Sequence, residues 1–143
     1  MQDLSNFSNN YFDLIIHPVS NCFINDIKPV WKEAYRVLKK KGRLLSGFTN
    51  PVLYMLNWEK TEKTKNCVIE NAIPYSDLKS LSDTEKREYK EKKIPFEFGH
   101  CLADQLGGQI EVGFIISGFY EDKGEELLDR YTSTFIATKA EKI

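Results

Sequence analysis

Several features that mark other classes of protein are missing from this 143-residue sequence. No apolar run approaches the roughly 20 residues of a transmembrane helix. The first ten residues, MQDLSNFSNN, lack the basic and apolar regions of a signal peptide. The three cysteines are odd in number and widely spaced, which argues against a disulfide framework or a zinc site. We therefore expect a cytoplasmic protein of one domain, without a bound metal.

The charge is nearly balanced, and the common catalytic motifs are absent. Twenty basic and 21 acidic residues give a net charge of −1, so nothing favours binding to nucleic acid or an anionic membrane. A glycine-rich phosphate loop, a G-x-S-x-G elbow and an H-E-x-x-H motif are all absent. The two histidines, His17 and His100, are far apart in sequence. A histidine at a strand end is more often a structural hydrogen-bonding group than a catalyst.

The first third of the chain reads as strand, helix, strand. The apolar run 12–17 predicts a strand buried on both faces, and 43–48 predicts a second strand. Between them, Asn25 or Asp26 can cap a helix that has Pro29 in its first turn. Lysines 39–41 would end that helix, with Gly42 in the left-handed conformation. A helical repeat predicts a buried face of Ile27, Val30, Trp31, Ala34, Val37 and Leu38.

The remaining two thirds are less regular. Residues 59–99 form a charged excursion, in which 76–93 reads as a solvated helix or a substrate-covering lid. Short strands are expected near 67–71 and 94–98, and a turn with a short helix near 121–131. A helix is expected at 100–112, with Leu102, Leu106 and Ile110 near one face, which can also include Gln109 and Val112. Two further strands, 114–120 and 134–139, close the predicted α/β domain.

Polar groups follow both early strands. His17, Pro18 and Val19 come after the first, and Thr49 and Asn50 come after the second. A strand–helix–strand unit makes the two strands parallel, so their carboxyl ends meet at one edge of the sheet, where ligands of open α/β sheets bind. The first strand therefore ends either in an ordinary loop or at a ligand site.

The first 50 residues resemble the second half of a class I S-adenosylmethionine-dependent methyltransferase domain. FDLII resembles the fourth strand, WKEAYRVLKKKG resembles the helix that ends in E-x-x-R-V-L-K-x-G-G, and RLLSG resembles the fifth strand. Lys41-Gly42 stands where the family often has two glycines. The family's glycine-rich cofactor turn and its ribose-binding acidic residue have no counterpart here. The resemblance thus implies the C-terminal part of a Rossmann-like methyltransferase fold, with parallel strands and a closing antiparallel strand pair. It also implies that the isolated chain is inactive and binds the cofactor very weakly or not at all.

The resemblance also implies site residues. Met1-Gln2-Asp3-Leu4 matches the tail of the family's adenine-lining loop, and the loop after the fourth strand faces the methionine end of S-adenosyl-L-methionine. The implied cofactor residues are Met1, Gln2, Asp3, Leu4, His17, Pro18 and Val19. Those implied for a small-molecule substrate are Asn21, Asn50, Tyr54 and His100. His17 is a candidate base.

Three functions compete at this point. The chain is part of a methyltransferase, a truncated inactive half-domain that serves as an association or binding module, or an unrelated small α/β enzyme that uses His17 or His100. The family's strand order places 12–17 beside 43–48, followed by the last strand and then 114–120. In that order one edge of 12–17 lacks a partner, so we expect the chain to self-associate there.

Overall fold

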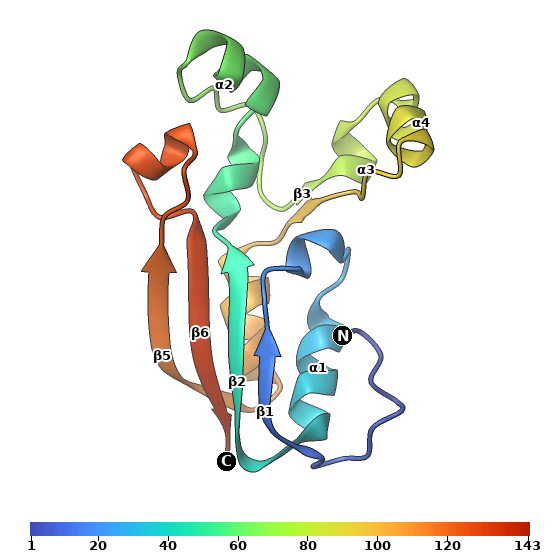
Figure 1. Ribbon diagram of the computed structural model, residues 1–143, viewed down its shortest axis with the longest axis vertical. Coiled ribbons are helices and arrows are strands. Elements are labelled where there is room, and N and C mark those ends of the chain that lie inside the picture. The colour runs from blue at the N-terminus through green and yellow to red at the C-terminus, as the bar shows by residue number, and fades with distance from the viewer.

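The main sheet of the protein has four strands. The structure, a computed structural model, describes residues 1–143. Its strands are β1 (Phe12–His17), β2 (Leu38–Thr49), β5 (Phe114–Asp122) and β6 (Phe135–Lys142), in the spatial order β1-β2-β6-β5 (Figure 1). β1 and β2 are parallel, and the other two pairings are antiparallel. The predicted α/β class and strand order are confirmed.

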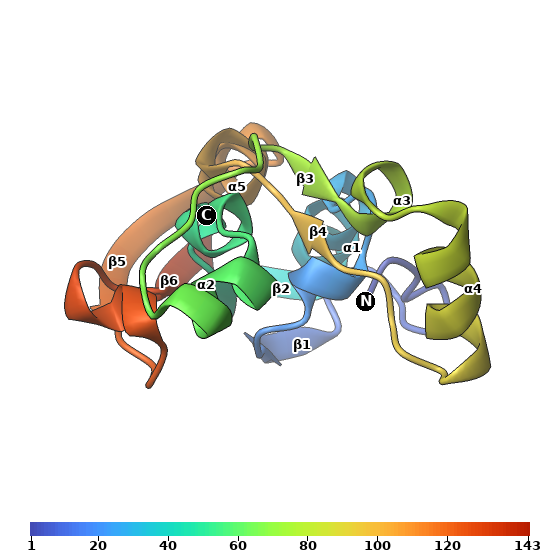
Figure 2. The same cartoon turned by 90° about the horizontal axis from the view of Figure 1, so that it is seen from above.

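The helices that pack on this sheet lie on one of its faces. α1 (Lys28–Val37) and α5 (Gly108–Glu111), which continues a π-helical segment η3 (Ala103–Gly107), cover the same side, as the view from above shows (Figure 2). The opposite face carries no helix. None of the helices is both long enough and apolar enough to cross a lipid bilayer.

The prediction that the first strand is buried on both faces is wrong. Ile15 and His17 point toward the helices and are buried. Leu14 and Ile16 point to the other side and are 47% and 66% exposed. Alternate residues of a strand face opposite sides, so a sheet covered on one side buries only every second residue.

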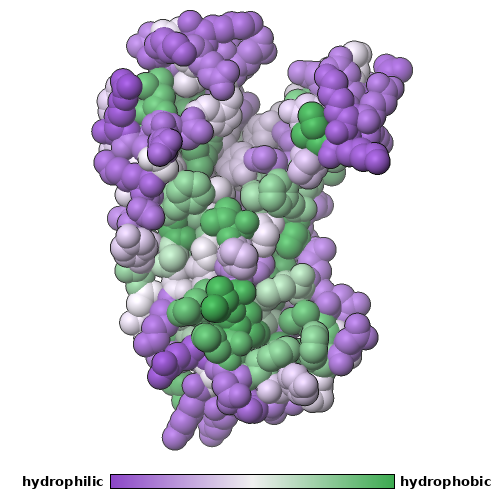
Figure 3. All heavy atoms as spheres, viewed as in Figure 1, coloured by the Kyte–Doolittle hydropathy of each residue, from purple (hydrophilic) through white to green (hydrophobic).

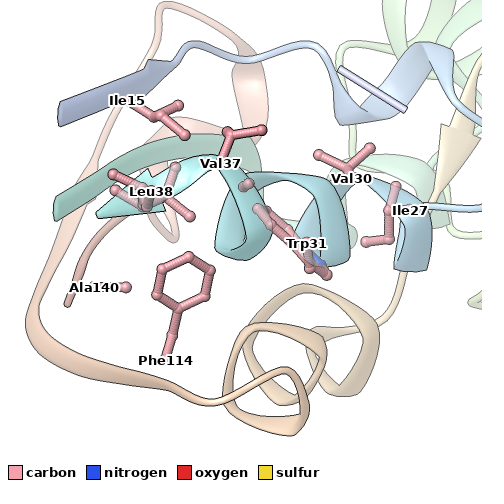
Figure 4. Close-up of a cluster of buried hydrophobic side chains, with 10 residues drawn as sticks. Ile15, Ile27, Val30, Trp31, Val37, Leu38, Phe114 and Ala140 are labelled. Carbon is pink, nitrogen blue, oxygen red and sulfur yellow. The ribbon is translucent and has the colours of Figure 1, made fainter. Parts of the chain in front are cut away.

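The hydrophobic core forms around α1, as its helical repeat predicts. All six positions of the predicted face are at most 1% exposed, and Figure 4 shows several of them converging with Ile15 and Phe114. The Trp31 indole Nε1 donates a hydrogen bond to the Asp104 carbonyl at 3.0 Å. Pro29 lies in the first helical turn as expected, and Asp26 Oδ1 accepts from the Lys28 amide at 3.0 Å.

The end of α1 differs from the prediction. The helix stops at Val37, and Leu38 already has an extended backbone and begins β2. The three lysines therefore belong to the strand. Lys41, not Gly42, has the positive φ, of 65°. Gly42 is required by packing instead, because a Cβ there would lie 2.8 Å from the Lys39 carbonyl oxygen.

The predicted face of the 100–112 helix is correct at Gln109 and wrong at Leu102 and Ile110. Leu102 and Ile110 are 41% and 59% exposed, whereas Gln105 and Gln109 are buried. The glutamines face the core because hydrogen bonds, described below, satisfy their amide groups there.

Most of the other elements lie beyond the carboxyl ends of β1 and β2 (Figure 1). They are η1 (Asn21–Phe23), η2 (Pro51–Met55), α2 (Trp58–Thr64), β3 (Tyr75–Ser76), α3 (Asp77–Ser80), α4 (Asp83–Glu91), β4 (Phe98–Gly99) and η4 (Leu127–Arg130). α4 buries none of its residues, so the solvated helix predicted at 76–93 is confirmed for Asp83–Glu91, whereas the start of that range forms the separate helix α3, in which Asp77 is buried. The strand expected at 67–71 is reduced to one bridge between Leu56 and Ile69, and the one at 94–98 begins only at Phe98.

Candidate functional site

The two parallel strands end at the same edge of the sheet, as a strand–helix–strand unit requires. β1 ends at His17 and β2 ends at Thr49, and both loops rise toward the elements above that edge (Figure 1). Two groups of polar residues gather there. One is a buried hydrogen-bonded row behind the sheet, and the other lines an open cleft between α2 and α4.

The buried row starts at the end of β1 and unites three residues that the sequence singled out. His17 Nε2 lies 2.7 Å from Asn21 Oδ1, and Asn21 Nδ2 donates to Gln105 Oε1 at 2.8 Å. His100 Nε2 lies 3.1 Å from the Asn21 carbonyl and 2.7 Å from the Ile24 carbonyl. Both histidines face acceptor oxygens, so in each ring Nε2 carries the proton.

The row continues across the sheet through further residues, of which the sequence analysis named only Gln109, as a member of a helix face. Gln109 Nε2 donates to the Gln105 carbonyl at 3.0 Å, and Thr138 Oγ1 donates to Gln109 Oε1 at 3.0 Å. Ser46 pairs with His17 on one side and with Thr138 on the other, and its buried hydroxyl has no partner. The spacing of Gln105 and Gln109, four residues apart in a helix, was the sequence signal that could have indicated this row.

The environment of His17 is that of a structural histidine. Its side chain is buried, and its ring meets the Trp31 ring edge-on with centroids 6.1 Å apart. Burial lowers the pKa of His17, because the charged imidazolium loses its hydration. The neutral ring fixes the loop after β1 through Asn21.

The signature E-x-x-R pair of α1 anchors the segment before β1. Glu33 Oε2 accepts from the Leu4 amide at 2.8 Å, and Arg36 donates to the carbonyls of Leu4 and Phe7, each at 2.9 Å. The two side chains also pair with each other at 2.7 Å. The hydrogen bond from Arg36 lowers the pKa of Glu33 to about 2. These contacts hold residues 1–4 against α1.

The residues implied for the cofactor occupy two places. Gln2 Nε2 donates to the Asp26 carbonyl, and Asp3 Oδ1 accepts from the Ser5 amide. Pro18 and Val19 are exposed beyond β1. No hydrogen bond joins the segment 1–4 to residues 17–19. The structure brings the two groups to the same half of the molecule without connecting them directly.

The cleft has a volume of about 440 Å³ and lies between the lobes formed by α2 and by α3 and α4. Figure 3 shows it as a hollow between two strongly hydrophilic projections. Aromatic and acidic side chains dominate its wall: Tyr54, Trp58, Tyr75, Tyr89, Glu59, Asp77, Glu85 and Glu97.

The floor of the cleft is a hydrogen-bonded unit of four residues. The Tyr54 hydroxyl donates to Glu97 Oε2 at 2.9 Å, and the Tyr75 hydroxyl donates to Asp77 Oδ1 at 2.7 Å. The Glu97 amide donates to Asp77 Oδ2 at 2.7 Å, and the two tyrosine rings stack with centroids 5.7 Å apart. Burial raises the pKa of both phenols, so they remain neutral donors.

Of the residues implied for the substrate, Tyr54 alone lines the cleft. Asn21 and His100 belong to the buried row. Asn50 Nδ2 donates to the Ser133 carbonyl at 2.9 Å, and its Oδ1 accepts from the Val52 amide at 3.3 Å. Its side chain therefore caps η2 and ties it to the loop before β6.

Comparison with known proteins gives a consistent assignment. A family described as "Methyltransferase domain" matches residues 1–46. A protein of Bacillus subtilis (strain 168) named "Uncharacterized methyltransferase YbaJ" is 47% identical over all 143 residues. The chain spans 56% of the length of that relative.

Two solved structures share the fold at low identity. An S-adenosylmethionine-dependent methyltransferase from Mesorhizobium loti is 13% identical with a TM-score of 0.66, and 95% of this chain aligns with 64% of that one. A putative S-adenosylmethionine-dependent methyltransferase from Listeria monocytogenes is 14% identical with a TM-score of 0.66, and 99% of this chain aligns with 66% of it. Together with the matched signature and the strand order, these similarities show that the chain resembles class I S-adenosylmethionine-dependent methyltransferases in sequence and shares their fold.

Proposed function

We propose that this chain provides the acceptor-binding part of an enzyme that transfers a methyl group from S-adenosyl-L-methionine to a small molecule. The observation that carries the proposal is the position of the cleft, which lies beyond the carboxyl ends of two parallel strands. η2 leads from the end of β2 directly to Tyr54 on the cleft floor. This position supports an acceptor site at the edge where ligands of such sheets bind.

The residues of this chain fit one side of the cofactor. Glu33 and Arg36 fix the backbone of residues 1–4, which we propose to line the adenine, and Pro18 and Val19 are exposed where the methionine end would lie. S-adenosylmethionine supplies an electrophilic methyl group on a sulfonium. The chain's own contribution is to orient the acceptor, and orientation alone supplies much of the rate of such a displacement. A role for His17 as base would rest on Nδ1, because Nε2 is paired with Asn21.

Binding of S-adenosylhomocysteine to the 143-residue chain tests this proposal. We expect millimolar or weaker affinity by calorimetry, because the glycine-rich turn and ribose carboxylate have no counterpart in these residues. Backbone amide shifts in NMR spectra should be confined to residues 1–4 and 17–19. A micromolar dissociation constant would contradict the expected weak binding, and shifts confined to other regions would refute the assigned cofactor residues.

A second candidate function is that of an association module, and the open side of the sheet favours it. β1 pairs only with β2, so its other edge is unpaired. The uncovered face carries the exposed apolar residues Leu14, Ile16, Leu45, Ile115 and Tyr120, and Figure 3 shows apolar surface over this part of the molecule. Unpaired edges and apolar patches of this kind promote pairing with another chain. We propose that the 143-residue chain self-associates through β1 and this face.

Sedimentation at micromolar concentration tests self-association. The unmodified chain should sediment as a dimer, and Ile16→Lys should shift it toward the monomer by placing a charge on the uncovered face. The matched control is Ile110→Lys, since Ile110 is similarly exposed but lies on α5, on the helical side. A monomer whose β1 amides are protected from hydrogen exchange would refute the idea.

A further inference from the structure

The wall of the cleft between α2 and α4 contains acidic and aromatic residues but no basic ones. Fifteen residues line it, and none of them is lysine, arginine or histidine, although the chain as a whole has nearly equal numbers of basic and acidic residues. Four of the fifteen are acidic, and four are aromatic. A wall of this composition attracts positive charge and repels anions.

Three of the four acidic groups of the cleft lack cationic partners. Asp77 is only 6% exposed, and neither Asp77, Glu85 nor Glu97 takes part in any of the protein's ion pairs. Glu59 is paired with Lys63 on α2. Asp77 has no counter-ion in the protein, and its carboxylate oxygens accept hydrogen bonds from the Tyr75 hydroxyl and the Glu97 amide. A bound cation would supply the missing charge.

Four aromatic side chains line the cleft beside these carboxylates. Tyr54 and Tyr75 stack on the floor, Trp58 stands on α2, and Tyr89 stands on α4 against Phe96. The phenols of Tyr54 and Tyr75 donate their protons to Glu97 and Asp77, which leaves their π faces and oxygen lone pairs electron-rich. Aromatic faces beside carboxylates are the usual recognition site for alkylammonium groups.

We propose that the cleft binds a positively charged alkylammonium group, and that the methyl acceptor is a small molecule that carries one. Calling this ligand the acceptor rests on the proposed methyltransferase function. The preference of the cleft for a cation does not, because it follows from its wall alone. The charged group is the feature by which the acceptor is held, whichever of its atoms receives the methyl group.

Choline and 3,3-dimethyl-1-butanol are the probes, since they share size and shape but only choline is charged. Each is titrated into the 143-residue chain without cofactor, and the indole N–H signal of Trp58 is followed by NMR, with buried Trp31 as the internal reference. We expect choline to bind about tenfold more tightly than the neutral alcohol. Equal affinities, or no shift at Trp58 with either probe, would overturn the proposal.

Substitutions of cleft residues test whether choline binds in the cleft. Glu97→Gln keeps the acceptor for the Tyr54 hydroxyl but removes a charge, and it should weaken choline binding severalfold without affecting the alcohol. Glu62→Gln is the matched control, because Glu62 is exposed on α2 and lies outside the cleft. Tyr89→Leu is a second test that leaves the floor intact, and it should also weaken choline binding. Unchanged choline affinity in both cleft variants would refute the assignment.

The closing experiment separates the two proposals. If choline binds as expected but S-adenosylhomocysteine causes shifts only outside residues 1–4 and 17–19, the cation site stands and the assigned cofactor site fails. If the cofactor product binds and choline does not, the methyltransferase role stands and the cationic acceptor is excluded.

Discussion

Substitution by alanine should change the stability of the protein in opposite directions at two adjacent glycines, Gly107 at the end of η3 and Gly108 at the start of α5. Gly107 and Gly108 have nearly identical helical backbones, with φ of −60° and −61°. A Cβ on Gly107 would meet nothing within 4 Å. A Cβ on Gly108 would lie 2.6 Å from Cδ1 of the buried Trp31 ring.

The magnitudes follow from these contacts. Alanine in place of a helical glycine stabilises a protein by about 0.5–1 kcal/mol, so Gly107→Ala should raise the free energy of unfolding by that amount. Gly108→Ala gains the same term but forces an overpacked contact, which typically costs about 1–3 kcal/mol. The ring cannot move aside freely, because its Nε1 is bonded to the Asp104 carbonyl. Gly108→Ala should therefore lie about 1–3 kcal/mol below Gly107→Ala, at or below the wild-type stability.

Urea unfolding followed by far-ultraviolet circular dichroism measures both variants, and an unchanged slope with denaturant shows that only stability differs. A Trp31→Leu background provides the coupling test. Removing the indole should reduce the gap between the two alanine variants to below about 0.5 kcal/mol, the level at which independent sites add. If Gly108→Ala stabilises the wild-type chain as much as Gly107→Ala does, the close packing of α5 on α1 is wrong.

Three further predictions concern the core and the joints of the fold. Trp31→Ala should lower the free energy of unfolding by about 3–5 kcal/mol, and a loss below about 1 kcal/mol would contradict its burial. Gly42→Ala should destabilise the chain in urea unfolding, since its Cβ would meet the Lys39 carbonyl, whereas Lys41→Gly should stabilise it by about 0.5 kcal/mol by relieving a positive φ. Because its folded-state pKa is depressed to about 2, Glu33 contributes stability that is complete above pH 4.5 and is lost as the pH falls toward 2. Glu33→Gln should flatten the stability profile in that acid range, and an unchanged profile would show that the ion pair does not act in this way.

The sequence by itself determined the elements whose signals are local or periodic. The buried face of α1 repeats with helical spacing, and the joint after it is short, so the β1–α1–β2 unit and its parallel pairing followed from patterns alone. The E-x-x-R signature carried the resemblance to methyltransferases, although its physical role, anchoring the Leu4 backbone, became visible only in three dimensions.

The tertiary structure decided which side of each later element is buried. Gln105 and Gln109 replaced the apolar residues of their helix in the core because Asn21 and Thr138, distant in sequence, satisfy their amides. Leu14 and Ile16 are exposed because no helix covers the second face of the sheet. Hydropathy could not reveal either result, since both depend on which distant segments meet.

The same limit applies to the candidate site. The histidine that ends β1 was the conspicuous residue in the sequence, yet it pairs internally with Asn21. The cleft instead collects aromatic and acidic residues from η2, α2, α3 and α4, most of which lie in a stretch that reads simply as charged. Folding brings Tyr54, Asp77 and Glu97 together through hydrogen bonds that span up to 43 positions of sequence, and no local pattern encodes such a meeting.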